Sequence, residues 1–449
     1  MKYVSTRGLA PECGFADVLL SGLAPDGGLY MPKSWPQVDL GAVPYKLAAF
    51  GILRCFAGEF CDEELKADVD AAYATFDDAD VAPLSYIGSN RYLLELFHGP
   101  TLAFKDIAMQ ILGRMFARAL AKRAGRAAVL AATSGDTGAA AIAALGGLPN
   151  IELFVIHPQG RVSEVQRRQM TTSRHANVHN IALEGSFDDA QALVKALFAD
   201  TAFAASVNLT AVNSINFARI AAQCVYYFTA MGELGRPATF VVPTGNFGDV
   251  FAGEAAMRMG LAVERLVVAT NANDIMVRAL NEGVYAAGQV QQTLSPSMDI
   301  QVASNFERAL FEASGRDAAY VRDAMARQPI ILSAPVRDAL AQRYSAFRVD
   351  DDETLATIAR VHTQTGMLID PHTAVGVAAA DRLRGDGPVV VLSTAHPAKF
   401  PDAVRRATGQ IPALPPGLSG LFDLPEKLDV LGADLGLVRG YIAARVPAS

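Results

Sequence analysis

The stretch Leu96-Phe-His-Gly-Pro-Thr-Leu-Ala-Phe-Lys-Asp106 contains a turn, a single lysine and the start of a helix. Gly99 and Pro100 break the chain after an apolar run, and a helical pattern begins at Ile107. Lys105 is therefore expected among apolar neighbours at the start of a helix. Loss of hydration lowers the pKa of an amine toward the range in which lysine is a nucleophile, as a Schiff-base lysine requires. A solvated lysine in an ordinary first helical turn is the alternative.

Length and composition indicate a large globular protein. The chain has 449 residues, enough for two or three domains, with 51% hydrophobic and 19% charged residues, which argues against long disordered segments. A net charge of −7 argues against nucleic acid and anionic membranes as partners. No run of residues is apolar enough for a membrane span or a signal peptide, so we expect a cytoplasmic protein, either a monomer or a homodimer. His175 and His179 lack a metal motif, and we expect them on a surface loop.

Three regions follow from the sequence pattern. Residues 1–82 form a mainly helical N-terminal unit, with helical patterns near Tyr45–Phe60 and Glu63–Phe76. Residues 83–400 form a core in which short apolar runs alternate with amphipathic helices, as is typical of βαβ units and a parallel sheet. Residues 401–449 form a C-terminal tail that we expect to pack on the core. The expected strands of the core are Ala127–Ala132, Ile151–Ile156, Val178–Leu183, Thr239–Val242, Arg265–Ala269 and Pro388–Leu392.

One expected strand leads into a turn suited to phosphate. The apolar run Thr239–Val242 is followed by Pro243-Thr-Gly-Asn-Phe-Gly-Asp249 and by a helical pattern from about Val250. Backbone N–H groups and the positive end of a helix then surround one point, which favours an anion. The spacing fits neither a P-loop nor a dinucleotide fingerprint. A plain strand-to-helix turn is the alternative.

A second strand has the same construction. Ala127–Ala132 leads into Thr133-Ser-Gly-Asp-Thr-Gly138, where the hydroxyls of Ser134 and Thr137 join the backbone donors and suit a carboxylate. Asp136 is unusual in an anion site. We expect it to accept a hydrogen bond from a phenol, a hydroxyl or an ammonium group, and simple capping of the helix is the alternative.

A third strand, expected to end at Leu392, is followed by Ser393-Thr-Ala-His-Pro-Ala-Lys-Phe400. A hydroxyl at this strand end suits a ring nitrogen, and Lys399 suits a second anionic group, unless it is a solvated loop cation. One desolvated lysine, two anion cradles and one hydroxyl are together what pyridoxal 5'-phosphate and an amino-acid substrate require.

In these motifs the chain resembles the threonine synthases, specifically their longer form with an N-terminal extension. These are pyridoxal-phosphate enzymes of the tryptophan-synthase-β group, fold type II. The resemblance implies an α/β fold of two open, twisted, mostly parallel sheets flanked by helices, with residues 83–400 as a pyridoxal-phosphate-dependent catalytic core made of two α/β subdomains. It is carried by Ser5–Gly8, Gly22–Pro32, Phe97–Asp106, Ser134–Gly138, Asn213–Asn216, Pro243–Asp249 and Ala395–Phe400, with Thr244 where serine is expected.

The resemblance also implies roles for individual residues. Lys105 would be the catalytic lysine that forms a Schiff base with the cofactor, and Thr394 would face the pyridine nitrogen. The cofactor phosphate would be held by Gly245, Asn246, Phe247, Gly248 and Asp249. The expected substrate-binding residues are Thr101, Ser134, Gly135, Asp136, Thr137, Gly138, Asn213, Asn216 and Lys399. For the phosphate group of the substrate, the candidate cations are Lys399, Arg161, Arg167, Arg168 and Arg219.

The implied reaction is a lyase reaction on a phosphate ester, the last step of threonine biosynthesis. O-phospho-L-homoserine and water give L-threonine and phosphate. Two rivals use parts of the same sequence: a serine or threonine dehydratase or cysteine synthase on the same fold, and a non-catalytic sensor of phosphorylated ligands. A dehydratase or cysteine synthase needs neither the N-terminal unit nor the segment His396-Pro-Ala-Lys399. A sensor has no need of a desolvated Lys105.

Overall fold

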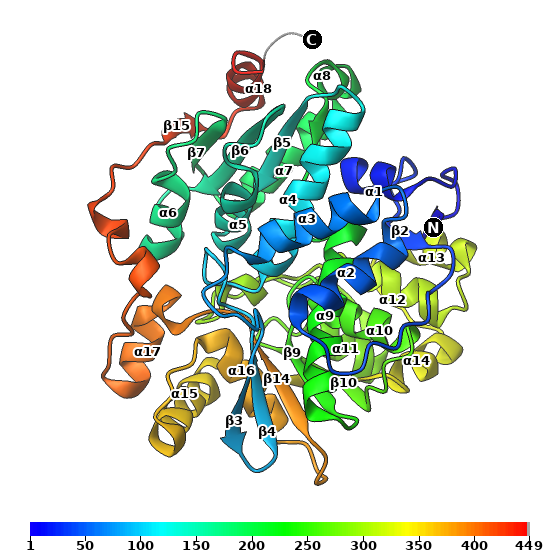
Figure 1. The fold of residues 1–449 in the computed structure, drawn as a ribbon, viewed down its shortest axis with the longest axis vertical. Helices are drawn as coiled ribbons and strands as arrows, with labels where there is room; N and C mark the ends of the chain where they lie inside the picture. Colours follow the sequence, from blue (N-terminus) through cyan, green and yellow to red (C-terminus); the bar gives the residue numbers. More distant parts are fainter. Residues whose placement is uncertain (447–449) are drawn as a thin grey trace.

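Two open sheets lie toward opposite ends of the molecule (Figure 1). In the computed structural model, which describes residues 1–446, all strand pairs of these sheets are parallel except β3–β4. The first sheet has the order β13 (Tyr344–Arg348), β10 (Arg265–Thr270), β9 (Thr239–Pro243), β14 (Val389–Ser393), β4 (Arg91–Glu95), β3 (Leu84–Gly88). The second has the order β15 (Asp429–Gly432), β7 (Val178–Glu184), β6 (Ile151–Pro158), β5 (Ala127–Ala132), β8 (Leu209–Thr210).

Helices cover both sheets. Because parallel strands are buried on both faces, the central strands consist almost entirely of apolar residues, as in Val389-Val-Val-Leu392. The helices of the core are α4 (Lys105–Lys122), α5 (Asp136–Leu145), α6 (Glu164–Thr171), α7 (Phe187–Ala199), α8 (Thr201–Ser206), α9 (Phe217–Leu234), α10 (Gly248–Arg258), α11 (Ile275–Glu282), α12 (Phe306–Ala313), α13 (Ala318–Met325), α14 (Ala334–Ala341), α15 (Asp351–Thr365), α16 (Pro371–Ala380) and α17 (Pro401–Thr408). Short 3₁₀ turns lie at Pro296–Met298, Pro397–Lys399, Pro416–Leu418 and Leu421–Asp423, and β11 (Val284–Tyr285) pairs with β12 (Ile330–Ile331).

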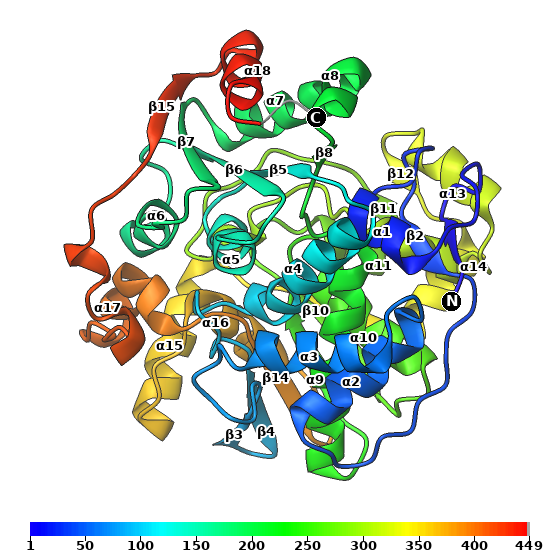
Figure 2. The ribbon, with the colours of Figure 1, turned by 45° about the horizontal axis from the view of Figure 1, so that its top comes forward.

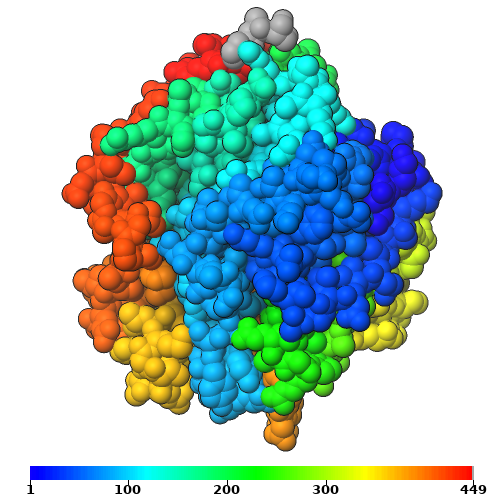
Figure 3. All heavy atoms as spheres, viewed as in Figure 1, coloured from blue at the N-terminus to red at the C-terminus, as the bar shows by residue number. Residues whose placement is uncertain are grey.

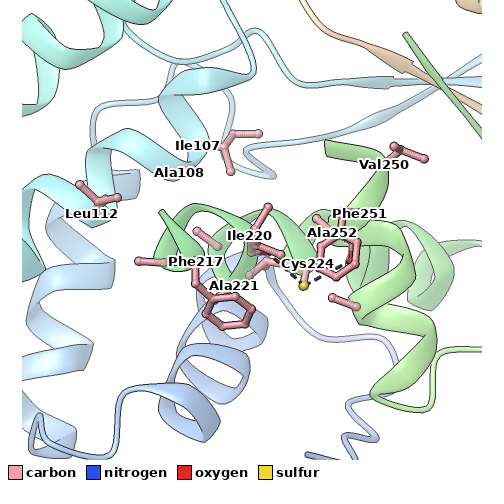
Figure 4. Packing of buried hydrophobic residues seen from close by; sticks show 14 of the residues in the cluster. Ile107, Ala108, Leu112, Phe217, Ile220, Ala221, Cys224, Val250, Phe251 and Ala252 are labelled. Atoms are coloured by element: carbon pink, nitrogen blue, oxygen red, sulfur yellow. Dashed lines mark hydrogen bonds between the residues drawn. The ribbon is translucent and has the colours of Figure 1, made fainter. Parts of the chain in front are cut away.

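Three helices meet at the centre of the molecule. Figure 4 shows Ile107 and Leu112 of α4 on one side of α9, with Phe251 of α10 on the other. Cys224 of α9 donates a hydrogen bond through its thiol to the carbonyl oxygen of Ala252 in α10, at 3.4 Å. This packing fixes the start of α10 beside the first turns of α9.

The N-terminal region packs on this helical centre. It contains the antiparallel pair β1 (Tyr3–Ser5) and β2 (Tyr30–Pro32), which α1 (Phe15–Ser21) connects, and then α2 (Tyr45–Phe56) and α3 (Asp62–Tyr73). The ring of Phe56 lies 5.4 Å from that of Phe217, so this region shares the hydrophobic core of α9. In the space-filling view these residues, in blue, form a broad part of one face (Figure 3).

The C-terminal tail runs along the second sheet. From α17 the chain passes to β15, which lies beside β7, and then to α18 (Leu435–Ala443), as Figures 1 and 2 show. Val438 and Ile442 are completely buried in a cluster with Phe154 and Leu183. The tail therefore contributes to the core of this sheet. The last residues of the expected tail, 447–449, lie outside the described residues.

The expected α/β fold with two mostly parallel sheets is confirmed, and each strand expected in the core occurs within one or two residues of its expected bounds. The strands of the two sheets that were not expected are the hairpin β3–β4 and the edge strands β13, β8 and β15; the short pair β11–β12 was not expected either. One expectation about histidines was wrong. His179 lies in β7, stacked on Phe154 and bonded to Glu152 at 2.9 Å, whereas His175 does lie in an exposed loop.

Candidate active site

A cavity of about 710 Å³, counting its open mouth, lies where the carboxyl ends of β5, β9 and β14 approach one another. Strand carboxyl ends are where open α/β sheets bind ligands. The lining residues are Phe104, Lys105, Asp136, Thr137, Ser214, Arg219, Gln223, Pro243, Thr244, Gly245, Asn246, Phe247, Gly248, Asp249, Val250, Ser297, Met298, His372, Thr394 and Ala395.

Lys105 is the first residue of α4 and points into this cavity. Leu102, with φ of 61°, and the turn after Pro100 bring the chain around sharply before the helix. The Lys105 Nζ lies 3.2 Å from the Oδ2 of Asp136 and 4.7 Å from the centre of the Phe104 ring. Burial lowers the pKa of this amine, and Asp136 opposes part of that change. The expected desolvated lysine is therefore present.

Asp136, the first residue of α5, is the acceptor for four side chains. It takes hydrogen bonds from Lys105, from Gln166 Nε2 at 2.8 Å and from Ser297 Oγ at 3.0 Å, and it pairs with Lys399 Nζ at 2.8 Å. Burial alone would raise the pKa of Asp136, but the two lysines hold it well below its ordinary value. Of the partners predicted for Asp136, the structure provides ammonium groups and a hydroxyl.

Lys399 and Thr101 lie behind this carboxylate rather than on the cavity wall. The Lys399 side chain is completely buried, and its Nζ also donates to the carbonyl oxygen of Thr101 at 2.7 Å. The Thr101 hydroxyl donates to Asp106 at 2.7 Å. Lys399 therefore neutralises Asp136, and the solvated loop cation considered from the sequence is excluded.

The segment Gly245–Asp249 forms one wall. Phe247 has φ of 62°, and α10 starts at the next residue, so the chain turns tightly into the helix. A Cβ on Gly245 would lie 2.8 Å from the carbonyl oxygen of Ser297, so only glycine fits there. Within residues 1–446, the backbone N–H groups of Gly245, Asn246 and Phe247 have no acceptor. This is the geometry of an anion cradle at a helix N-terminus.

His372 and Ser297 are cavity residues that the sequence analysis missed. The Nδ1 of His372 lies 2.7 Å from the carboxylate of Asp370, which caps α16, and its Nε2 accepts the backbone N–H of Ser297 at 3.2 Å. These contacts hold the Pro296–Met298 turn over the cavity. The helix-start pattern Asp370-Pro-His-Thr373 was a usable signal, because it follows a helix and precedes an apolar run.

The residues expected on the substrate side divide into two groups. Asp136 and Thr137 line the cavity, as does Thr394, which is expected to face the cofactor. The other expected substrate residues do not line it, namely Thr101, Ser134, Gly135, Gly138, Asn213, Asn216 and Lys399. The N–H groups of Gly135 and Gly138 are already bonded to Thr133 Oγ1, both at 2.9 Å. Asn216 caps α9 through Ala218 N–H and donates to Leu19 O, so both ends of its amide are occupied.

The candidate cations for a substrate phosphate are similarly divided. Arg167 and Arg168 point toward Glu426 of the tail, with 2.5 Å from Arg167 Nη1 to its carboxylate. Arg161 is not among the lining residues, whereas Arg219 is. Among residues 1–446, no group of His, Cys, Asp and Glu side chains is arranged to hold a metal ion.

The donor set fits pyridoxal 5'-phosphate. Lys105 offers an amine of lowered pKa for the aldehyde, and the cradle offers unpaired N–H groups for the phosphate. Arg219 faces the cavity with buried Nε and Nη1 atoms that have no partner in the described structure. A lysine at the start of a helix, an anion cradle after a parallel strand and a hydroxyl after the adjacent strand define a pyridoxal-phosphate enzyme of fold type II.

Comparison with known families gives the same class and a particular family. The model described as pyridoxal-phosphate dependent enzyme matches residues 84–395, and models of the threonine synthase N terminus and C-terminal region match residues 2–73 and 373–442. The chain belongs to the threonine synthase family, and pyridoxal 5'-phosphate is its cofactor.

Individual relatives agree along the whole length. The threonine synthase of Pseudomonas aeruginosa is 48% identical over 99% of this chain and 98% of its own length. The crystal structure of pyridoxal-phosphate-bound threonine synthase from Brucella melitensis is 50% identical, with a TM-score of 0.97 and complete coverage of both chains. The structure of threonine synthase from yeast has a TM-score of 0.93 at 37% identity, over 99% of this chain and 98% of the yeast chain.

Proposed function

We propose that the cavity around Lys105 converts O-phospho-L-homoserine and water into L-threonine and phosphate, the last step of threonine biosynthesis. Protons leave Cα and Cβ, and phosphate leaves Cγ. A proton then adds at Cγ, water supplies a hydroxyl to Cβ, and a proton returns to Cα. The observation that carries this proposal is a buried Lys105 amine of lowered pKa facing an anion cradle in one cavity.

Lys105 is the proposed base and acid of the reaction. When bound, pyridoxal 5'-phosphate supplies an electron sink for the charge that develops at Cα. The Lys105 amine is neutral for a larger fraction of the time than an exposed lysine, so it can take the Cα proton. Once it has released that proton and is neutral again, it can take the Cβ proton. Asp136 holds the amine at 3.2 Å and thereby orients it toward the cavity.

Other residues have proposed positioning roles. The start of α5, with Thr137 on the cavity wall, suits the substrate carboxylate, and Thr394 suits the pyridine nitrogen. The Phe104 ring and Met298 exclude water from one side of Lys105. The expected substrate residues that do not line the cavity stay proposals, namely Thr101, Ser134, Gly135, Gly138, Asn213, Asn216 and Lys399.

A product assay with two lysine variants tests the function. The purified protein, given O-phospho-L-homoserine, is expected to release phosphate and threonine in equal amounts. Lys105→Ala is expected to lose both products, at least about 10³-fold in kcat, together with the visible absorption of the bound cofactor. Lys122→Ala changes an exposed lysine on the same helix that pairs with Glu64, and it is expected to retain both.

The alternative outcomes are distinguishable. Phosphate released with 2-oxobutyrate in place of threonine would show a lyase that does not add water at Cβ. Turnover of serine in preference to O-phospho-L-homoserine would favour a dehydratase. A protein that binds O-phospho-L-homoserine with no release of phosphate would favour the sensor.

The broader organisation is proposed with the function. Residues 1–82, 83–400 and 401–449 are proposed as N-terminal unit, catalytic core and tail, in a cytoplasmic enzyme that is a monomer or homodimer. Among residues 1–446, no helix is long and apolar enough to cross a membrane. Sedimentation analysis of the purified protein measures the oligomeric state.

A further inference from the structure

Helix α6 depends on contacts with other elements for its position. It has only eight residues, and isolated helices shorter than about 12–15 residues are marginal in water. Only two of its buried side chains, Val165 and Met170, are apolar, so hydrophobic packing holds it at few points. The polar contacts on its two faces therefore decide where it lies.

The inner face of α6 carries two amides that reach residues around Lys105. Gln166 donates through Nε2 to Asp136 Oδ1 at 2.8 Å, and its Oε1 accepts the backbone N–H of Ser163 at 3.2 Å, so both ends of this amide are fixed. Gln169, three residues later on the same side of the helix, donates to the carbonyl oxygen of Thr101 at 3.1 Å. Helix α6 thus contacts both the central carboxylate and the turn that leads into α4.

The two oxygens of the Asp136 carboxylate have different partners. Oδ1 is held by Gln166 and Lys399, both at 2.8 Å. Oδ2 faces Lys105 Nζ at 3.2 Å and Ser297 Oγ at 3.0 Å. Because a carboxylate is planar and rigid, the contacts of Oδ1 determine the direction of Oδ2. Gln166 therefore helps to aim Oδ2 at the Lys105 amine.

The outer face of α6 is bound by the tail segment Phe422–Lys427, and the tail, in orange, runs beside this helix in both ribbon views (Figures 1 and 2). Glu426 accepts from Arg167 Nη1 at 2.5 Å and from Thr171 Oγ1 at 2.7 Å. Burial alone would raise the pKa of Glu426, but Thr171 and Arg167 hold it below its ordinary value, so the carboxylate is charged at neutral pH. The Lys427 N–H donates to the carbonyl oxygen of Thr171 at 2.6 Å, a group that the last turn of a helix leaves without an intrahelical partner.

A second arginine strengthens this docking. Arg168 donates through Nη1 to the carbonyl oxygens of Phe422 at 2.7 Å and of Leu424 at 3.3 Å. Its guanidinium also lies 5.6 Å from the centre of the Phe422 ring. The tail segment is therefore bound through both its backbone and its side chains.

We propose that Gln166 is a positioning residue for Lys105, and that the tail segment Phe422–Lys427 keeps Gln166 in place by holding α6. Loss of the tail contact then changes the chemistry at Lys105, although no residue of this segment lines the cavity. The inference rests on the proposed function only in taking Lys105 as the residue that binds the cofactor and moves protons.

The groups that face the Lys105 amine set the direction of the effect. Besides Asp136, the charged or titratable groups around it are Lys399, Arg219, Asp249 and His372. Burial lowers the pKa of Lys105, and Asp136 opposes that change. A carboxylate that is no longer aimed at the amine opposes it less. The pKa of Lys105 then falls, and cofactor binding begins at a lower pH.

A double-mutant cycle in the full-length protein tests the connection. Glu426→Gln removes the charge at similar size, and Gln166→Leu removes the amide. Glu426→Gln is expected to lower kcat for phosphate release from O-phospho-L-homoserine by about 2- to 30-fold, the usual size of such indirect coupling, and Gln166→Leu by at least as much. Both are expected to shift the pH dependence of cofactor binding, followed by absorption, to lower pH. With Gln166→Leu present, Glu426→Gln is expected to have no further effect on either quantity.

A control in the same tail and a readout without turnover complete the test. Asp429 lies in β15 and pairs with Tyr441 and Arg445 rather than with α6, so Asp429→Asn is expected to keep the wild-type kcat and pH dependence. Hydrogen–deuterium exchange of the holoenzymes is expected to show faster exchange of the α6 amides in Glu426→Gln than in the wild type. Glu426→Asp, which keeps the charge, is expected to lie between them.

Three results would overturn the proposal. Equal changes in Asp429→Asn would show an effect of overall stability. Effects of Glu426→Gln and Gln166→Leu that add fully would show that the tail acts by another route. Faster exchange in α6 with unchanged kcat and pH dependence would show that the tail contact is structural only. A protein that makes no threonine but shows the linked pH shifts would contradict the proposed reaction and leave this proposal standing.

Discussion

At the scale of single residues, Asp136 determines the charge at the centre of the site. The carboxylate has two buried lysines as partners, with Nζ–O distances of 3.2 Å to Lys105 and 2.8 Å to Lys399. Gln166 and Ser297 complete its hydrogen bonding. Breaking a buried ion pair by removing one partner costs far more than the pair contributes, because the remaining charge is left without compensation.

Substituting Asp136→Asn therefore has two expected effects. The free energy of unfolding falls by about 3–5 kcal/mol, since two buried ammonium groups lose their counter-charge. Because Asp136 raises the pKa of Lys105 against the effect of burial, its removal lowers that pKa further. The pH at which the amine becomes neutral and binds the cofactor then moves down, which absorption titrations between pH 6 and pH 10 measure.

The matched control for this substitution is Asp381→Asn. Asp381 pairs with Arg91 and Arg360 near the surface, where ion pairs contribute about 0–1 kcal/mol. The variant Asp381→Asn is expected to have the same pH profile of cofactor binding as the wild type. A profile for Asp136→Asn that coincides with that of this control would contradict the assigned role of Asp136.

Local sequence predicted some site residues and not others, for a physical reason. Lys105 and Gly245–Asp249 lie within continuous motifs whose own composition indicates desolvation or an anion cradle. His372 and Ser297 come from segments 75 residues apart in the chain, joined by a hydrogen bond that forms only after the sheet is assembled. Asn216 lies in a matching motif, and its side chain caps α9, a contact that the motif alone did not predict.

At the scale of elements, the turn Gly99–Phe104 and the start of α4 form one rigid piece. Asp106 accepts the N–H of Thr101 at 2.7 Å and its hydroxyl at 2.7 Å. A Cβ on Gly99 would lie 2.4 Å from the Cβ of Asp106, so glycine is required where the turn passes over the helix. The backbone that presents Lys105 is therefore held by a buried carboxylate one residue away.

This carboxylate predicts a pH dependence of stability. Burial raises the pKa of Asp106 from 3.8 to about 6, so the folded protein binds this proton more tightly than the unfolded chain. The resulting stabilisation is complete below the unfolded pKa and is lost as the pH rises through about 6. Between pH 5 and pH 8, this group should lower the free energy of unfolding by about 1–1.5 kcal/mol.

Urea unfolding of wild type and Asp106→Asn at both pH values isolates this contribution, because all other groups titrate alike in the two proteins. The free energy of unfolding of the wild type relative to that of the variant should be smaller at pH 8 than at pH 5, by about 1–1.5 kcal/mol. A difference that does not change with pH would refute the raised pKa of Asp106.

The strands show what periodicity can and cannot predict. Buried parallel strands such as β5, β6 and β9 are short apolar runs, and their sequence alone was sufficient to predict their positions. The hairpin β3–β4 was missed for two reasons. No residue of β3 is fully buried, and the turn is Ser89-Asn90, with φ of 51° and 59°, in place of the more familiar Asn-Gly. Its place at the sheet edge depends on β14, almost 300 residues later in the chain.

At the scale of the whole molecule, the N-terminal region is connected to the phosphate cradle through α12. Arg308 of α12 donates to the carbonyl oxygen of Tyr30 at 3.1 Å, to that of Ile215 at 2.6 Å and to Asn305. Asn305 in turn donates to the carbonyl oxygen of Asn246, within the cradle, through its backbone and through its side chain, both at 3.0 Å. The N-terminal region thus helps to fix the loop that is proposed to hold the cofactor phosphate.

Arg308→Met should therefore affect both stability and cofactor binding. Two buried carbonyl oxygens lose their donor, which is expected to lower the free energy of unfolding by about 2–4 kcal/mol. Asn305 loses one of its partners, so the cradle becomes less ordered and the Kd for pyridoxal 5'-phosphate rises. Urea unfolding and cofactor titration measure the two effects separately.

The control Arg316→Met separates a local effect from a general one. Arg316 also donates to the N-terminal region, through the carbonyl oxygens of Pro32 and Lys33, but it has no contact with Asn305 or the cradle. Its loss should reduce stability while leaving the Kd for the cofactor unchanged. If the two variants changed cofactor binding equally for a given loss of stability, the N-terminal region would act only through overall stability. If Arg308→Met alone weakens binding, its connection to Asn246 is the cause.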